Sequence, residues 1–253
     1  MAHALITGGT EGIGLAFARA LAAEGYTLTL VARRAARLAA VSESLPGGPH
    51  AAVTADLSTE EGLSVVVDAL RDRPPTLLVN NAGAGCYGAF HFGTWSEQGS
   101  LWRLNAEALA TLAHVFLAGA RPGDALINVS SILGFLPQPT SAMYSATKAF
   151  VTALSEALWY ENRKRGVYVM GLHPGITHTS FRSRAGGSRS PAFWAASPEA
   201  VVARALRALR RRRQPTVVFG GFNHLLAALP RLFPRQLLIR ILGATRSKRR
   251  GDA

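Results

Sequence analysis

The chain has 253 residues, of which 48% are hydrophobic and 17% are charged, and its formal net charge is +13. The composition excludes a disordered chain, and the length suits one large α/β domain or two small ones. Residues 201–253 carry a net charge of +12 and residues 1–200 only +1, which argues against nucleic acid as a partner of the whole chain and places any anionic partner at the C-terminal part.

Strand and helix patterns alternate from the first residues onward. Short apolar runs that end in turn residues predict strands at 3–7, 26–32, 51–57, 76–83, 124–131, 167–175 and 214–221. Segments with helical periodicity lie between them, at 12–25, 33–45, 60–73, 101–120, 141–166 and 197–213. The last begins with Ser197 as N-cap and Pro198 at the first helical position. This alternation predicts an α/β fold with one doubly wound, Rossmann-like, mostly parallel sheet of seven strands and helices on both faces.

The sequence shows no signal that would direct the chain out of the cytoplasm. The one cysteine, Cys86, allows no internal disulfide, which is typical of a reducing compartment. The first strand begins at once, without the basic and apolar regions of a signal peptide. The sequence contains no uncharged run of eighteen apolar residues, which is the pattern that would predict a transmembrane helix. We therefore expect a cytoplasmic protein, and the basic tail leaves peripheral attachment to a membrane open.

A glycine-rich turn, TGGTEGIG, joins the first predicted strand to the first predicted helix. Gly8, Gly12 and Gly14 let the backbone approach a ligand closely, and the N–H groups and positive end of the helix attract a pyrophosphate. The spacing is G-x-x-x-G-x-G and differs from the general dinucleotide fingerprint. At the first strand–helix turn of a parallel sheet, this turn predicts nucleotide binding.

The end of the second strand carries Arg33 and Arg34 and lacks the acid that binds the ribose hydroxyls in NAD-binding proteins. A guanidinium group favours a 2′-phosphate, so we expect NADP(H) as the cofactor. We expect no metal. Glu11, inside the glycine turn, argues against this preference, since a basic residue there would help to bind a phosphate. Asp56, at the end of the third strand, is expected either to accept a bond from the adenine amine or to cap a helix.

Tyr144 and Lys148 stand four residues apart, on one face of a predicted helix. Six motifs over residues 2–220 resemble, in this order, those of the short-chain dehydrogenases/reductases: TGGTEGIG, NNAG at 80–83, Asn105, NVSS at 128–131, YSATK at 144–148 and HPGITHT at 173–179. Thirteen positions separate Ser131 from Tyr144, a spacing common in that family, which favours Ser131 over Ser130.

This resemblance implies a catalytic tetrad of Asn105, Ser131, Tyr144 and Lys148. Tyr144 would be the general acid/base, and Ser131 would bind the substrate oxygen. Lys148 would hold the nicotinamide ribose and lower the pKa of Tyr144, and Asn105 would anchor a water that links Lys148 to solvent. A cation about 4 Å from the phenol, at an effective dielectric constant of about 20, is worth roughly 4 kcal/mol, which would bring the tyrosine pKa from about 10 towards 7.

The resemblance also places residues 80–83 on the adenosine side of the cofactor, and Ile176 and Thr179 at the nicotinamide amide. Together with the glycine turn and the two arginines, the expected cofactor-binding residues are Thr7, Gly8, Gly12, Ile13, Gly14, Arg33, Arg34, Asp56, Leu57, Asn80, Ala82, Gly83, Tyr144, Lys148, Pro174, Gly175, Ile176 and Thr179.

The implied activity is the NADPH-dependent interconversion of an apolar carbonyl compound, a ketone or 3-oxoacyl substrate, and a secondary alcohol. The alternative is a non-catalytic sensor of NADP(H), because the fold alone does not fix function. His91 and His173 are not expected to be catalytic, since a tyrosine acid/base is present.

Two loops that carry no motif are expected to shape the substrate site. Their aromatic residues either line an apolar pocket or pack as ordinary loop residues, and they are Phe90, Phe92, Phe181, Phe193 and Trp194. The second loop, residues 180–197, is expected to act as a lid with hinges at Gly186 and Gly187.

The chain beyond residue 220 departs from the compact core of that family. We expect a dinucleotide-binding catalytic domain at 1–220 and a basic, amphipathic extension at 221–253, which Pro230 and Pro234 divide into short helical pieces. Three roles stay open for the extension: it caps the active site and packs on a second subunit, lies as a binding module on an anionic membrane surface, or meets an acidic partner such as an acyl carrier protein or nucleic acid. The resemblance implies a homodimer or homotetramer.

Overall fold

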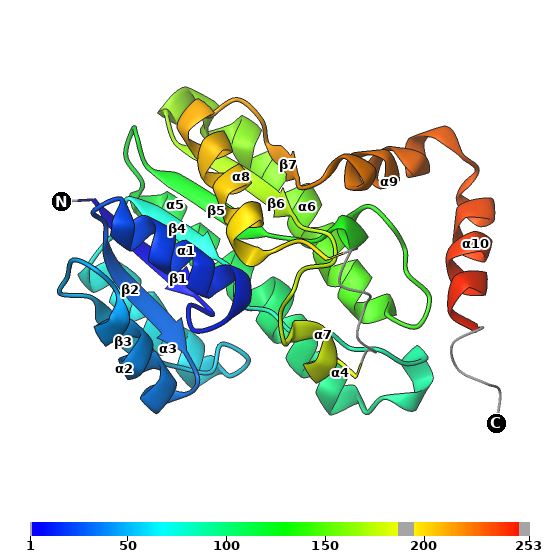
Figure 1. Ribbon diagram of the computed structural model, residues 1–253, viewed down its shortest axis with the longest axis horizontal. Helices are drawn as coiled ribbons and strands as arrows, with labels where there is room; N and C mark the ends of the chain where they lie inside the picture. Colours follow the sequence, from blue (N-terminus) through cyan, green and yellow to red (C-terminus); the bar gives the residue numbers. More distant parts are fainter. Residues whose placement is uncertain (1, 187–194, 248–253) are drawn as a thin grey trace.

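Seven parallel strands form one sheet in the computed structural model, which describes residues 2–186 and 195–247 (Figure 1). The strand order is β3-β2-β1-β4-β5-β6-β7, which confirms the expected fold class. Gly187, Phe193 and Trp194, expected in the lid and in the substrate pocket, lie outside the described residues. The strands are β1 (His3–Thr7), β2 (Thr27–Ala32), β3 (Ala51–Thr54), β4 (Leu77–Asn80), β5 (Ala125–Val129), β6 (Tyr168–His173) and β7 (Thr216–Val218).

Helices cover both faces of this sheet (Figure 1). One face is covered by α1 (Gly12–Ala23), α2 (Ala35–Ser44) and α8 (Pro198–Arg211), and the other by α3 (Glu60–Asp72), α5 (Ala108–Gly119) and α6 (Ala142–Asn162). The remaining helical segments are η1 (Phe90–Phe92), α4 (Trp95–Trp102), η2 (Arg103–Glu107), η3 (Ile132–Gly134), η4 (Arg163–Arg165), α7 (Phe181–Arg184), α9 (Gly221–Leu232) and α10 (Arg235–Ser247).

Side chains of β1 alternate between the two helical layers. Ala4 and Ile6 pack in the cluster that includes α1 and α8, whereas Leu5 packs in the cluster that includes α3 and α5. A strand that is buried on both faces has a continuous apolar sequence, as this one does. Burial of each large side chain contributes about 1.5–3 kcal/mol, so the end of β1 is held firmly in place for the turn that follows.

The order of the strands reverses between β1 and β4. From β1 the chain continues outward through β2 and β3, and it then returns to add β4 on the other side of β1. The connections that leave the carboxyl ends of these two strands therefore run in opposite directions and open a crevice between them. Ligands of doubly wound folds bind at this topological switch point.

The helix expected at 101–120 begins earlier and is irregular. It starts with α4, where Thr94 and Glu97 form a capping box in which each side chain accepts a hydrogen bond from the other residue's backbone N–H. It then passes through the π-helical turn η2 into α5. Single π turns inside α-helices are frequent at functional sites, and this one carries Asn105.

The C-terminal extension forms two helices beside the edge of the sheet (Figure 1). The chain was expected to break at Pro230, but α9 includes this proline and ends two residues later, at Leu232. A proline inside a helix removes one backbone bond and crowds the preceding turn, which is consistent with the early end of α9. The break comes at Phe233 and Pro234. Leu226 and Leu238 pack with Ile132 in a small cluster that attaches both helices to η3.

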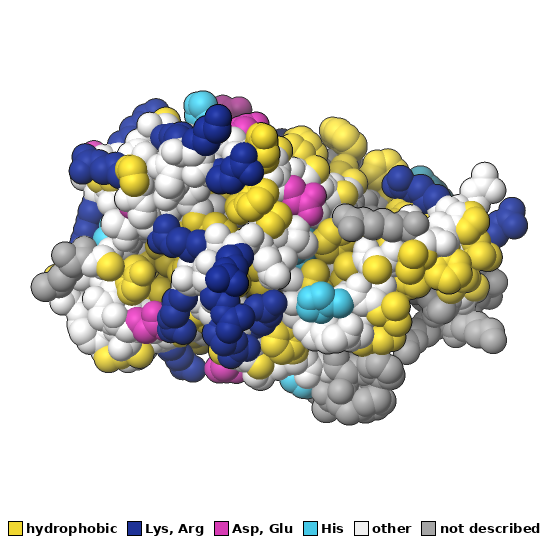
Figure 2. Space-filling view, turned by 90° about the horizontal axis from the view of Figure 1, so that it is seen from above, with side chains coloured by type: hydrophobic (Ala, Val, Ile, Leu, Met, Phe, Trp, Pro, Cys, Tyr) yellow, Lys and Arg dark blue, Asp and Glu magenta, His cyan; other side chains and the backbone are white. Residues whose placement is uncertain are grey.

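Apolar side chains also remain at the surface of this extension. Hydrophobic atoms gather toward the right-hand end of Figure 2, where α9 and α10 lie. The exposed large residues there include Leu225, Leu232, Phe233, Leu237 and Ile241. Among the described residues, the helices are too short or too polar to cross a bilayer.

Candidate active site

The glycine turn lies at the switch point and is built for close approach of its own backbone. Gly8 and Gly12 have positive φ angles of 67° and 51°, which favour glycine. A Cβ atom on Gly14 would lie 2.2 Å from the Gly8 carbonyl oxygen. Glu11 is the N-cap residue of α1, and its side chain makes no cap bond. The helix N-terminus thus keeps backbone N–H groups for an anion.

Thr7 and Asn81 fix the turn to the end of β4. The Thr7 hydroxyl accepts hydrogen bonds of 2.9 Å from the backbone N–H groups of Asn81 and Ala82. The Asn81 side chain donates to the Thr7 and Gly8 carbonyls at 2.9 and 3.2 Å. Asn81 was included in the NNAG motif but not among the individual cofactor-binding residues, and the structure gives it the contacts to the glycine turn.

The side chain of Asn80 faces the interior of the protein, away from the crevice. It is buried and donates to the Leu109 carbonyl and to Asn128 Oδ1, at 3.2 and 3.1 Å. Asn128 in turn donates to Ser155 at 3.1 Å. Residues along a strand alternate in direction, so the last residue of β4 faces the helical layer. The Asn80 side chain therefore joins β4, β5 and α6, and the placement of residues 80–83 beside the cofactor stays a prediction.

Three of the four tetrad residues meet where β5 ends and α6 begins. Ser131 follows β5, Tyr144 lies in the first turn of α6, and Lys148 lies one turn later. Tyr144 is buried and shares a hydrogen bond with the Ser131 side chain. The Lys148 ammonium donates to the Val129 carbonyl at 2.8 Å and lies 5.8 Å from the centre of the Tyr144 ring.

Burial dominates the acid–base properties of this pair. It raises the pKa of Tyr144, although the bond from Ser131 acts in the opposite direction, and it lowers the pKa of Lys148 to about 8. The expected fall in the tyrosine pKa does not occur in this structure, because desolvation of the phenolate dominates and the Lys148 ammonium is directed to the Val129 carbonyl. Tyr144 therefore keeps its proton at neutral pH and is set up as an acid.

Asn105 connects the π turn to the loop after β4. Its amide oxygen accepts a bond from the Ala84 N–H, and its NH₂ group donates to the Ala84 carbonyl and to Thr147, over 2.9–3.2 Å. Both of its donors are therefore used by the protein. A Cβ atom on Gly83 would lie 3.2 Å from Asn105 Oδ1 and 3.6 Å from Lys148 Nζ, so Gly83 keeps Asn105 and Lys148 around one small space.

The arginines after β2 already have acidic partners. Arg33 lies 3.6 Å from Asp56, while Arg34 pairs with Glu11. Burial alone would raise the pKa of Asp56, but two hydrogen bonds from Ser58 and the charge of Arg33 outweigh it and lower the pKa. Both bonds go to Oδ1, at 2.9 Å from the N–H and 2.7 Å from the hydroxyl. Asp56 thus organises the turn before α3, whose N-cap is Thr59.

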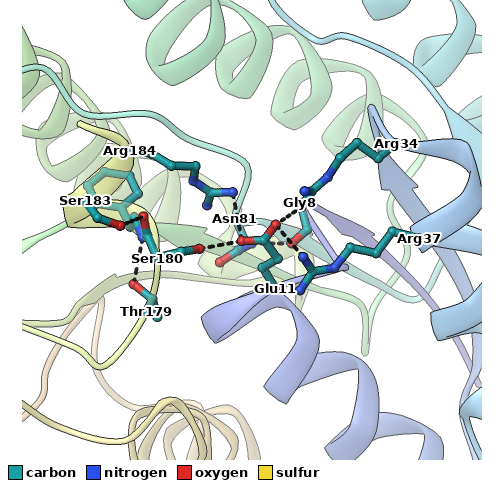
Figure 3. Close-up of polar contacts among 10 residues, drawn as sticks. Gly8, Glu11, Arg34, Arg37, Asn81, Thr179, Ser180, Ser183 and Arg184 are labelled. Carbon is teal, nitrogen blue, oxygen red and sulfur yellow. Dashed lines mark hydrogen bonds and ion pairs between the residues drawn. The ribbon is translucent and has the colours of Figure 1, made fainter. Parts of the chain in front are cut away.

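Two arginines that the sequence did not single out join this group. Arg37 of α2 and Arg184 of α7 contact the Glu11 carboxylate at 3.1 and 2.8 Å (Figure 3). Arg37 could have been found, since it lies one helical turn after Arg33 and Arg34. Arg184 could not, because 173 positions separate it from Glu11 and no local pattern links them.

The HPGITHT motif borders the same crevice. The Pro174 carbonyl accepts a bond of 3.0 Å from Ile132 N–H. Ile176 is exposed, and Thr179 lies so close to Gly12 that a Cβ atom on this glycine would approach the Thr179 methyl group to 2.7 Å. A Cβ atom on Gly175 would approach Asn223 of α9 to 2.4 Å. The motif is therefore clamped between the glycine turn and the C-terminal extension.

The remaining cofactor candidates support this crevice from below. Leu57 is buried near Thr7, Asn80 and Ala82, with which it surrounds a narrow internal gap. Ile13 is partly buried against the core. These side chains position the turn rather than present polar groups.

His173 is buried beside Ser131. Its Nδ1 atom lies 3.2 Å from the Ser131 carbonyl, and Nε2 has no partner in the described structure. Burial, reinforced by Lys148, lowers the pKa of His173 to about 4 despite the bond to Ser131. The imidazole is thus neutral at neutral pH and positions Ser131 through its Nδ1–H group.

The expected aromatic pocket is formed only in part. Phe181 stacks against Tyr144 with 5.6 Å between ring centres. Phe90 and Phe92 are exposed on η1, where His91 stacks on Phe92. The short 3-10 turn directs these side chains outward, so they do not line an apolar pocket in this structure.

Known proteins are similar to this chain in sequence and in architecture. The model of the short chain dehydrogenase family matches residues 2–188. The chain is 32% identical over 209 residues to a very-long-chain 3-oxoacyl-CoA reductase-like protein of Arabidopsis thaliana, covering 78% of this chain and 66% of that one. It is 31% identical over 186 residues to the inactive hydroxysteroid dehydrogenase-like protein 1 of Homo sapiens, covering 70% and 56%. The chain thus spans less than two thirds of the length of these curated relatives.

A solved structure gives the same result. A short-chain dehydrogenase from Sphingobium yanoikuyae in complex with NADPH superimposes with a TM-score of 0.80 and 30% identity, covering 92% of this chain and 95% of that one. With the family model matched over most of the length and Ser131, Tyr144 and Lys148 brought together between the end of β5 and the start of α6, the chain belongs to the short-chain dehydrogenase family of oxidoreductases.

Proposed function

We propose that this protein is an NADPH-dependent reductase of apolar carbonyl compounds, ketones or 3-oxoacyl substrates, and that it also catalyses the reverse oxidation of secondary alcohols. The observation that carries the proposal is the buried, hydrogen-bonded pair of Ser131 and Tyr144 beneath the ring of Phe181. A carbonyl oxygen that enters between the two hydroxyl groups would accept a hydrogen bond from each.

The residues around the crevice fit a nicotinamide dinucleotide. The uncapped N-terminus of α1 suits a pyrophosphate, and the guanidinium groups after β2 suit a 2′-phosphate. Glu11 and Asp56 have the opposite preference for charge, and arginines offset both: Arg34, Arg37 and Arg184 at Glu11, and Arg33 at Asp56. Lys148 and Gly83 would lie on the nicotinamide ribose side. When bound, such a cofactor supplies the hydride that is added to the carbonyl carbon.

The protein itself supplies the proton and the geometry. Tyr144 gives its phenolic proton to the carbonyl oxygen, which becomes the hydroxyl group of the alcohol. The Lys148 ammonium, near the resulting tyrosinate, stabilises the negative charge in a site of low dielectric constant. Ser131 holds the substrate oxygen, and its own position is fixed by the Leu133 N–H and by His173 below. In the oxidation direction, the same groups act in reverse.

Apolar surroundings favour an apolar substrate. Phe181 covers Tyr144, and the relative named as a very-long-chain 3-oxoacyl-CoA reductase-like protein suggests acyl thioesters as one class to test. The basic extension beyond residue 220 would then receive an acidic carrier or an anionic membrane at the rim of the site. We further propose a cytoplasmic homodimer or homotetramer, which size-exclusion chromatography with light scattering tests.

The first experiment is calorimetry with NADPH and NADH on the wild type and on Arg33→Ala, followed by NADPH oxidation with a panel of ketones and 3-oxoacyl thioesters. We expect NADPH to bind more tightly than NADH, and Arg33→Ala to weaken NADPH binding about tenfold, the effect of losing one exposed charge-assisted contact. An Arg71→Ala variant, which removes an exposed arginine on α3, serves as the control. Absence of binding by either cofactor would remove the enzyme hypothesis.

A second candidate is a non-catalytic sensor of NADP(H). The human relative that is named inactive favours it. A sensor would bind NADPH in the calorimeter but oxidise none of it with any carbonyl compound of the panel. Turnover with one of them would exclude the sensor.

A further inference from the structure

One carboxylate connects two parts of the molecule that belong to different steps of the proposed reaction. Glu11 lies in the glycine turn, and its side chain is only 14% exposed. Arg34 and Arg37 reach it from the start of α2, on one side (Figure 3). Arg184 reaches it at 2.8 Å and the Ser180 hydroxyl donates to it at 2.6 Å, both from the other side. The two carboxylate oxygens thus have four partners, which is close to their full capacity.

The partners on the second side belong to residues 179–185, which we name the α7 segment. At one end of it, Thr179 covers Gly12 of the glycine turn. Further along, Phe181 stacks on Tyr144, and the Ala185 carbonyl accepts a bond of 3.2 Å from Tyr87 N–H. The segment therefore extends from the cofactor turn to the general acid. The contacts of Arg184 and Ser180 with Glu11 therefore help to set the position of the Phe181 ring over Tyr144.

The partners on the first side belong to what we name the arginine cluster, Arg33, Arg34 and Arg37. Burial lowers the pKa of Arg184, and the charges of Arg33 and Arg37 lower it further. Arg184 thus lies within electrostatic reach of the cluster. Four guanidinium groups here face two carboxylates, Glu11 and Asp56, so the site carries a surplus of positive charge.

We propose that Glu11 is a positioning residue that couples occupation of the arginine cluster to closure of the α7 segment over Tyr144. This inference rests on the proposed use of NADPH. Arg34 and Arg37 contact Oε1 of Glu11, whereas Arg184 and Ser180 contact Oε2, so the two sides share the charge of one carboxylate. A 2′-phosphate that draws Arg34 and Arg37 away from Oε1 leaves more of this charge to Arg184 and Ser180, which tightens the segment. Arg184 at the same time offsets the repulsion between Glu11 and the phosphate. NADH has no 2′-phosphate, so Arg34 and Arg37 continue to neutralise part of the Glu11 charge. NADPH would then differ from NADH in two ways: it would bind more tightly, and it would close the α7 segment more firmly over Tyr144.

Amide hydrogen exchange of peptides from residues 179–186 tests the coupling. The probes are NADPH, NADH, AMP and adenosine 2′,5′-bisphosphate, each at saturation. The bisphosphate carries the phosphate but has no nicotinamide, so any protection that it gives to the α7 segment does not come from a nicotinamide contact. In the wild type we expect NADPH and the bisphosphate to slow exchange about tenfold more than NADH and AMP, the effect of one strengthened charge-assisted bond.

Variants separate the coupling from simple binding. Glu11→Gln and Arg184→Gln should abolish the phosphate-dependent difference and raise KM for the carbonyl substrate more than they lower kcat, and Arg184→Lys should restore part of it. Arg71→Gln, which removes an exposed pair on α3, should behave as the wild type. Thermal melts of each variant verify folding.

The outcomes distinguish this inference from the proposed function. Equal protection by NADPH and NADH in the wild type, or an undiminished difference in Glu11→Gln, would overturn the coupling while calorimetric NADPH binding leaves the proposed function intact. If calorimetry detects binding of neither NADPH nor the bisphosphate, both the coupling and the proposed cofactor fall.

Discussion

The start of α6 and the C-terminal helices both depart from the usual pattern of apolar side chains inside and polar side chains outside, but in opposite ways. At the start of α6, Tyr144 and Lys148 are buried polar groups. On α9 and α10, Leu225 and Leu237 are apolar groups left in contact with solvent. Each arrangement costs stability relative to the normal pattern. The comparison teaches that departures from the burial pattern indicate where to test for function: the proposed chemistry at the start of α6, and the proposed contact with another surface on α9 and α10.

Tyr144→Phe should have the largest effect. Loss of the phenolic proton donor should lower kcat about 10²–10⁴-fold, the usual contribution of a general acid. The ring and its contact with Phe181 persist, so NADPH affinity should stay within about twofold of the wild type. Single-turnover kinetics and calorimetry measure the two quantities. Turnover at the wild-type rate would show that another group supplies the proton.

Buried His173 should make the stability of the folded protein sensitive to acid. Its folded-state pKa of about 4 lies below the unfolded value of 6.5, so the unfolded state binds more protons between these values. Stability is therefore lost as the pH falls from 6.5 towards 4, by an amount on the order of 3 kcal/mol.

His173→Asn is the matched variant, because the amide NH₂ group can replace Nδ1–H as donor to the Ser131 carbonyl. Urea unfolding at several pH values should show a smaller loss for this variant in that range. Parallel curves for the two proteins would mean that other groups, such as His3, whose pKa burial also lowers, dominate acid unfolding.

Two neighbouring leucines of α10 sharpen the contrast within the extension. Leu238 is 5% exposed and Leu237 is 47% exposed. Leu238→Ala should lower the free energy of unfolding by about 2 kcal/mol, whereas Leu237→Ala should change it by less than about 0.5 kcal/mol. Denaturant unfolding measures both. In sedimentation with anionic vesicles, we expect the opposite order: Leu237→Ala should reduce the bound fraction more than Leu238→Ala. Equal effects of the two variants on vesicle binding would argue against the membrane role of this face.

Lys148→Met should change activity and stability in opposite directions. The variant should lose turnover, yet gain about 1 kcal/mol of stability at pH 7, because removal of a buried charge outweighs the lost bond to the Val129 carbonyl. The folded-state pKa of about 8 lies below the unfolded 10.5, so the wild type gains stability as the pH rises through this range. The advantage of the variant should therefore shrink above pH 8. A variant less stable than wild type at every pH would show that the hydrogen bond dominates.

Sequence patterns were sufficient for the sheet and for the residues that follow its central strands. HALIT became β1 with the expected bounds, because a buried strand needs a continuous apolar run. Ser131, Tyr144 and Lys148 came together because only the short η3 and a loop separate β5 from α6. The π turn around Asn105, the inward direction of Asn80 and the pairing of Arg184 with Glu11 were not predictable. They depend on contacts between distant segments, which no local period encodes.

The Tyr144 pKa shows a different limit. The helical spacing placed Lys148 on the correct face, but spacing alone could not show that the ammonium donates to the Val129 carbonyl or that burial would dominate.

The contact between Gly175 and Asn223 also constrains how this protein can be redesigned. A Cβ atom at position 175 would lie 2.4 Å from the Asn223 side chain, so the loop and α9 fit only as a pair. A chimera that combines residues 1–220 with another C-terminus, or a shortened chain that ends before α9, would uncover Gly175 as well as Ile132 and Val218. A partner module is therefore better added after α10 than in place of the extension, because both α9 and α10 pack on η3.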